Sequence, residues 1–180
     1  MIARFAIALS PAPALALAAL AGCSTVADLP DRGLGSATLM RSTGQPAGTA
    51  QIVQVGDTVT LAVGLSGLSA GVHGMHLHTT GACNGPDFAS AGGHLNPLGK
   101  QHGALAAGGK HAGDLPNVTI QPGGSGALTA DLTGTPAEVK AWLFDGDGTA
   151  IVVHADPDDY KTDPAGNAGG RIACGVIRPT

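Results

Sequence analysis

The chain has few charged and few aromatic residues. Asp, Glu, Lys and Arg make up 12% of its 180 residues and Phe, Trp and Tyr 3%, whereas glycine alone occupies 29 positions. Glycine destabilises helix interiors by about 1 kcal/mol relative to alanine, so this composition disfavours a helical bundle. The sequence has no run of basic residues, and its formal net charge is −4. Because nucleic-acid binding needs clustered cations that neutralise phosphates, we expect no nucleic-acid partner.

A long apolar run that could span a membrane is also lacking. Arg4 precedes a mostly apolar stretch over residues 5–20, which is too short for a spanning helix and contains Pro11 and Pro13. A positive charge, a short apolar stretch and small residues at its end are typical of an export signal. We therefore predict a signal peptide over residues 1–22.

The end of this stretch, LAGC at residues 20–23, resembles a bacterial lipobox. The resemblance implies cleavage before Cys23, a diacylglycerol on its sulfur, and a location in the periplasm or cell envelope. The membrane would then be contacted only through this lipid anchor. The alternative is a plain signal peptide that is cleaved nearby, with Cys23 incidental. Residues 23–34 are predicted to be a tether to a folded domain over residues 35–180.

The number of cysteines is odd, at three. If Cys23 is acylated, Cys83 and Cys174 remain as an even pair in an oxidising compartment. A bridge between them would close a loop that spans most of the domain and would stabilise it by about 4–5 kcal/mol. Free thiols are the alternative for an exported chain.

Short segments of alternating apolar and polar residues predict β-strands. The clearest runs over residues 59–65, where every second side chain is apolar. Similar runs occur at residues 37–40, 50–55, 118–121, 127–132, 139–144, 150–154 and 172–177. Clusters of Gly, Pro, Asp and Asn separate them, and no stretch shows a sustained helical period. This pattern predicts an antiparallel sandwich or barrel. Two glycine-rich segments, 79–113 and 155–171, are too long for strands and are predicted to be loops that carry a site.

The positions of the seven histidines indicate metal binding. His76 and His78 lie two apart at the end of a predicted strand, so both rings face the same side. His73 falls on the other face, which favours a structural, hydrogen-bonded role for it. His154 ends another predicted strand. Together with His76 and His78 it forms a set of nitrogen ligands that suits copper and leaves a position open for a substrate.

The first long loop supplies a second set of possible ligands. Its three histidines and one carboxylate make up the four ligands of a closed tetrahedral zinc site. They are His94, His102, His111 and Asp114.

Four long motifs resemble copper, zinc superoxide dismutases of the bacterial periplasmic type. They are GVHGMHLH at 71–78, SAGGHLNP at 90–97, GKHAGDLPN at 109–117 and GNAGGRIACGVI at 166–177. The resemblance covers about residues 35–178. It implies an all-β fold, a Greek-key antiparallel β-sandwich or flattened barrel of about eight strands with two long site-bearing loops.

The resemblance also assigns roles to individual residues. The implied copper ligands are His76, His78, His94 and His154, and the implied zinc ligands are His94, His102, His111 and Asp114. His94 would thus bridge both metals and move a proton during the reaction. Arg171 would attract the anionic substrate. Asp158 would hydrogen-bond one ligand of each metal. Cys83 and Cys174 match the family disulfide.

The implied function is the dismutation of superoxide to dioxygen and hydrogen peroxide with copper and zinc as cofactors. The alternative is a periplasmic copper- or zinc-binding protein without dismutase activity. The segment between His154 and Arg171 carries Lys161 as its one cation among four aspartates, so the source of electrostatic steering stays open. The resemblance is compatible with either a homodimer or a monomer.

Overall fold

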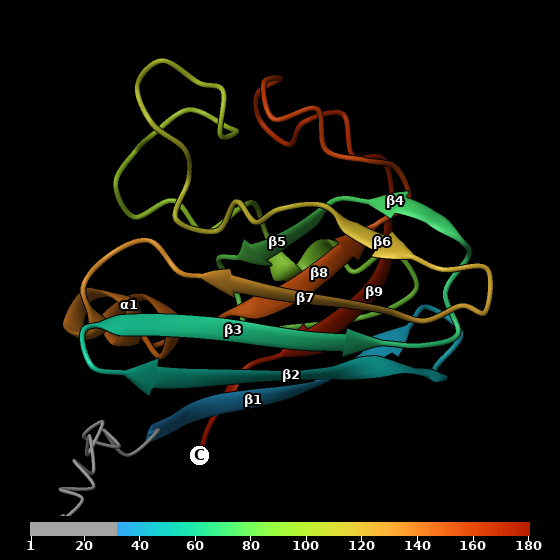
Figure 1. Cartoon of the computed structure of the whole chain (residues 1–180), viewed down its shortest axis with the longest axis horizontal. Helices are drawn as coiled ribbons and strands as arrows, with labels where there is room; N and C mark the ends of the chain where they lie inside the picture. The colour runs from blue at the N-terminus through green and yellow to red at the C-terminus, as the bar shows by residue number, and fades with distance from the viewer. Residues whose placement is uncertain (1–31) are drawn as a thin grey trace, which may run out of the picture.

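The computed structural model describes residues 32–180, which form strands joined by loops of very different length (Figure 1). The predicted signal peptide, Cys23 and most of the predicted tether lie outside these residues. The strands of the described part are β1 (Arg32–Arg41), β2 (Pro46–Val55), β3 (Thr58–Leu65), β4 (Gly71–His73), β5 (Met75–His78), β6 (Val118–Ile120), β7 (Gly126–Asp131), β8 (Ala150–His154), β9 (Arg171–Val176) and β10 (Arg178–Pro179). A 3-10 helix, Ala89–Ala91, and one α-helix, α1 (Pro136–Leu143), complete the elements.

All strand pairs of the main sheet are antiparallel. Its eight strands follow the order β5-β8-β9-β1-β2-β3-β7, with β10 paired to β1, while β4 and β6 form a separate two-stranded sheet. The sheet curls, so that β2, β3 and β7 face the part made by β5, β8 and β9 (Figure 1). The predicted all-β fold is therefore confirmed.

The core lies between these two parts of the sheet. In β3 the buried positions alternate with exposed ones, as the sequence pattern predicted, and Leu61 and Val63 point inward. They belong to one apolar cluster with Leu77 of β5 and with Ile151 and Val153 of β8. Burial of each such side chain stabilises the folded protein by about 1.5–3 kcal/mol. Here this burial holds β5 and β8 against the rest of the sheet.

Every residue of β8 is buried, because both faces of this strand are covered. Ile151 and Val153 face the main core, whereas Val152 faces a second, small cluster that includes Phe88 and Cys174. The loop that follows β5 therefore packs on the outer face of β8. This packing places the loop next to the end of the strand that carries His154.

The structure differs from the sequence predictions at two places. Residues 139–144 were predicted to be a strand, but they lie mainly in α1, so that prediction is wrong. Thr135 caps α1 in a capping box with Glu138, and proline occupies the first turn. The tether was predicted to extend to residue 34, yet β1 already begins at Arg32, because residues 32–33 pair with β2. None of the helices within residues 32–180 is long and apolar enough to cross a bilayer.

Candidate metal centre

Two neighbouring strands carry three of the predicted ligands. His76 and His78 lie two apart on β5, and His154 ends β8, which pairs with β5. A register shift follows Val153, so His154 pairs with Arg171 at the start of β9. The three rings are buried, and each offers a nitrogen that lies within 4.8 Å of those of the others.

The first long loop is attached to β5 by backbone hydrogen bonds. Leu77 N donates to Gly113 O (2.9 Å), Gly113 N donates to Leu95 O (2.9 Å), and Leu95 N donates to Leu77 O (2.8 Å). These three bonds form a closed ring among three segments that are distant in sequence. They place the adjacent residues His94 and Asp114 beside β5, opposite His78 and His76.

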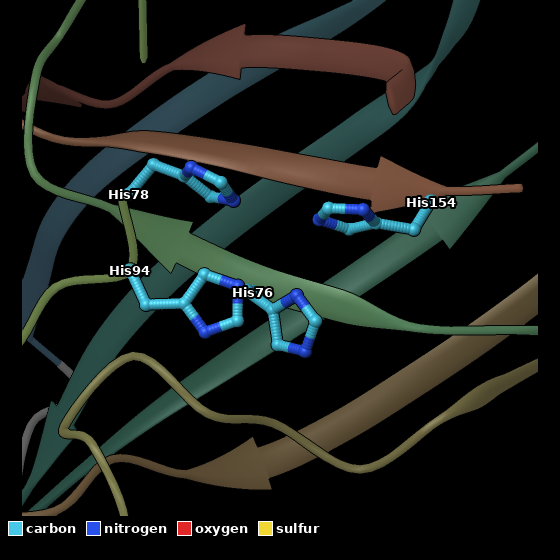
Figure 2. A group of neighbouring side chains, drawn as sticks. All are labelled: His76, His78, His94 and His154. Carbon is cyan, nitrogen blue, oxygen red and sulfur yellow. The ribbon is translucent and has the colours of Figure 1, made fainter. Parts of the chain in front are cut away.

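The first group of side chains consists of four buried histidines that point toward one another (Figure 2). One nitrogen of each ring is buried and has no hydrogen-bond partner: His76 Nδ1, His78 Nε2, His94 Nε2 and His154 Nε2. Buried polar atoms without a partner are rare in folded proteins. Four of them facing one space match the lone pairs that a bound metal ion would require, so the residues fit a metal.

The opposite nitrogen of three of these rings is held by an acceptor. Asp158 Oδ2 lies 2.8 Å from His76 Nε2, Gly92 O lies 2.9 Å from His78 Nδ1, and Gly169 O lies 3.1 Å from His154 Nδ1. Because a carbonyl or carboxylate oxygen only accepts, the ring proton sits on that nitrogen. The lone pair of the other nitrogen is thereby directed into the centre of the group.

The second group surrounds one carboxylate oxygen. Asp114 Oδ1 lies 2.9 Å from His94 Nδ1, 3.1 Å from His102 Nδ1 and 3.2 Å from His111 Nδ1. The contact with His102 Nδ1 lacks hydrogen-bond geometry, and that nitrogen has no partner. Asp114 Oδ2 instead accepts the N–H groups of Gly103 and His111. Three imidazoles and one carboxylate oxygen thus converge, as the sequence predicted, and fit a tetrahedral zinc ion.

Two side chains connect the groups. His94 belongs to both, with Nε2 in the first and Nδ1 in the second. Asp158 lies outside both and holds His76 through Oδ2 and His102 through Oδ1, at 2.8 and 2.9 Å. The structure therefore brings together every residue that the sequence placed in the two ligand sets, and puts Asp158 between them. His73 is in neither group; its ring contacts the carbonyls of Ser69 and His154.

Burial favours the neutral form of three of the rings. It lowers the pKa of His94 and of His154 to about 4 and that of His78 to about 2. Burial alone would raise the pKa of Asp114, but hydrogen bonds from His94 and the Gly103 N–H outweigh it, and the pKa lies below its usual range. Neutral imidazoles and an ionised carboxylate are the forms that bind metals, so these four side chains are in the metal-binding form at neutral pH.

Arg171 lies beside the first group, close enough to lower the pKa of His78 and of His154. Its guanidinium donates from Nη1 to Phe88 O (2.7 Å) and from Nη2 to Gly92 O (2.6 Å). Both acceptors belong to the loop that the disulfide between Cys83 and Cys174 ties to β9. Arg171 and the cysteine pair could be predicted from the sequence, but these two carbonyls could not. Every residue has a backbone carbonyl, so residue type does not indicate which one accepts a hydrogen bond.

The fold and the site define a β-sandwich protein with two adjacent metal-binding groups that share an imidazole. The copper/zinc superoxide dismutase family model matches residues 46–177. The chain belongs to this family. It is 44% identical over 146 residues to "Superoxide dismutase [Cu-Zn] 2" of Aquifex aeolicus, and the match covers 79% of this chain and 85% of that protein.

Solved structures show the same fold. A SOD-like protein from Bacillus subtilis superposes with a TM-score of 0.74 at 33% identity, covering 81% of this chain and 99% of that one. The Cu/Zn superoxide dismutase from Brucella abortus gives a TM-score of 0.63 at 27% identity, covering 79% and 98%.

Proposed function

We propose that this chain dismutes superoxide to dioxygen and hydrogen peroxide, with copper and zinc as cofactors. The observation that carries this proposal is the ring of His94, which presents an unpartnered Nε2 to one histidine group and its Nδ1 to the other. Membership of the copper/zinc superoxide dismutase family supports the same reaction.

The chemistry of the two groups assigns the metals. Four imidazole nitrogens suit copper, so His76, His78, His94 and His154 hold it in our proposal. Three imidazoles with one carboxylate suit zinc, which assigns His94, His102, His111 and Asp114 to it. When bound, copper supplies the one-electron redox couple and zinc a fixed positive charge.

The residues of the chain attract the anion and handle the protons. The reaction converts two superoxide anions and two protons to one dioxygen and one hydrogen peroxide. The guanidinium of Arg171, oriented by its hydrogen bonds to the carbonyls of Phe88 and Gly92, attracts the anion toward the histidine group. His94 Nε2 takes up one proton from solvent and releases it to the departing peroxide, which receives its second proton from solvent. Asp158 keeps the neighbouring rings of His76 and His102 in place.

The test compares two single variants of the metal-loaded protein. His154→Ala removes a ligand from the copper group only, so it should abolish superoxide removal and retain most zinc. His111→Ala is the matched control, because it removes a ligand from the zinc group only and should lower zinc content more than copper content. If the loaded unaltered chain removes no superoxide, the dismutase proposal fails and the alternative of a metal-binding protein stands. Equal zinc loss in both variants would contradict two distinct sites.

We further propose that the protein is exported, cleaved before Cys23 and anchored to a membrane of the cell envelope by lipid on that cysteine. The apolar stretch at residues 5–20 and the LAGC sequence that ends at Cys23 support this proposal. Mass spectrometry of the N-terminal peptide should find a diacylglycerol adduct, and Cys23→Ser should release the protein from membranes. A soluble, unmodified chain in the unaltered strain would refute the anchor.

A further inference from the structure

The side chain of Asn117 hydrogen-bonds both backbone polar groups of Asp158. Asn117 Nδ2 donates to Asp158 O, and Asp158 N donates to Asn117 Oδ1, both at 2.9 Å. A side-chain amide supplies a donor and an acceptor side by side, as this pair of bonds requires. Asn117 directly precedes β6, so this pair of hydrogen bonds connects the loop that carries Asp158 to the strand β6.

The same asparagine is joined to Tyr160, the one tyrosine in the chain. Asn117 N donates to the Tyr160 hydroxyl (2.8 Å), and Tyr160 N donates to Asp158 Oδ1 (2.7 Å). Tyr160 O accepts the N–H of Leu105 in the first long loop (3.0 Å). There the two loops touch so closely that a Cβ on Gly103 would lie 2.0 Å from Tyr160 O.

We propose that Asn117 and Tyr160 form a clasp that positions Asp158 and, through it, the rings of His76 and His102. Both carboxylate oxygens of Asp158 are engaged by these rings, so a rotation or shift of Asp158 would release the two Nε2 protons from their acceptors. The Nδ1 lone pairs would then lose their fixed direction. Neither clasp residue contributes an atom to either ligand group. The inference rests on the proposed metal centre, and it adds two residues that act on the metal ligands through Asp158.

Zinc affinity of the metal-free full-length protein, measured by competition with a chromophoric chelator, tests the clasp. Asn117→Ala removes both bonds to Asp158 and should lower zinc affinity about tenfold. Tyr160→Phe removes one oxygen only and should lower it about threefold. Asn96→Ala is the matched control, because Asn96 makes the same pair of bonds to Lys100, away from Asp158. Its zinc affinity should equal that of the unaltered chain.

A double-mutant cycle separates positioning from a general loss of stability. Once Asp158→Asn has removed the carboxylate, the further change Asn117→Ala should alter zinc affinity less than twofold, because the clasp acts through Asp158. Cobalt in place of zinc gives a second readout: its visible spectrum should change in Asn117→Ala and stay unchanged in Asn96→Ala.

The outcomes that contradict the clasp differ from those that contradict the metal centre. If the unaltered chain binds no zinc, the proposed centre is wrong and the clasp with it. If the unaltered chain binds zinc and both clasp variants match it, or if the two effects in the cycle add, the clasp alone is overturned. Should Asn117→Ala not fold, Tyr160→Phe decides, because it preserves the ring and its packing.

Discussion

Reduction of the disulfide between Cys83 and Cys174 is expected to destabilise the metal-free protein strongly. The bridge connects the first long loop to β9 and joins cysteines 91 positions apart. In the chain-entropy model, opening a loop of this length lowers the free energy of unfolding by about 4.6 kcal/mol. For a chain of this size, the melting temperature should fall by about 9–18 °C.

The same reduction should also lower dismutase activity of the loaded enzyme. The loop that Cys83 anchors carries Phe88 and Gly92, whose carbonyls accept the guanidinium of Arg171. Neither half of the disulfide belongs to a metal-binding group, so the copper and zinc content should stay constant while Arg171 loses its fixed acceptors.

Urea denaturation of the metal-free protein, with and without a phosphine reductant, measures the stability change. The double variant Cys83→Ala with Cys174→Ala separates the loss of the bridge from effects of the reductant. Cys23→Ser in both arms removes the third thiol, which could otherwise pair with a released cysteine. A loss below about 1 kcal/mol would refute the reasoning, because it would mean that the loop is equally restricted without the bridge.

Three further changes probe the site. Arg171→Ala should lower the rate of superoxide dismutation about tenfold or more and weaken the salt dependence of that rate, while the copper content stays unchanged. Stopped-flow kinetics and metal analysis measure the two. A fall in copper content would mean that Arg171 has a structural role. Gly166→Ala would place a Cβ 1.8 Å from Asp158 Oδ1 and should lower zinc affinity about 10–100-fold, whereas retained affinity would show that Asp158 is dispensable. Burial lowers the pKa of His94 and of His154 from 6.5 to about 4, so the unfolded metal-free chain binds more protons between these values. The free energy of unfolding of the metal-free protein should therefore fall as the pH drops from 7 to 4, by up to about 3 kcal/mol for each ring. Urea titrations at several pH values measure this change, and a free energy that does not vary with pH would contradict it.

The strand pattern and the ligand types could be predicted from the sequence because both follow local rules. The alternation in β3 and the spacing of His76 and His78 depend only on the two-residue period of a strand. The same period predicts that His73 lies on the other face, and the structure places it outside both ligand groups. The assignment of His94 to both groups came from family resemblance, since spacing alone placed it with the zinc set.

The rest depends on contacts between segments that are far apart in sequence. Helix α1 has eight residues, too few for a visible helical period, although Thr135 and Glu138 carried a capping signal that was missed. The closed ring of backbone bonds among Leu77, Leu95 and Gly113 involves no side chain at all. Such long-range backbone contacts decide where His94 and Asp114 lie, and only the folded chain shows them.

The ring of His94 and the carboxylate of Asp158 each touch both ligand groups, so the two sites are thermodynamically linked. An ion in one site orders two side chains that the other site also requires. By linkage, the factor by which zinc changes the affinity for copper equals the factor by which copper changes the affinity for zinc. The order in which the two metal ions bind therefore does not change the final doubly loaded state. It determines only which singly loaded form accumulates first.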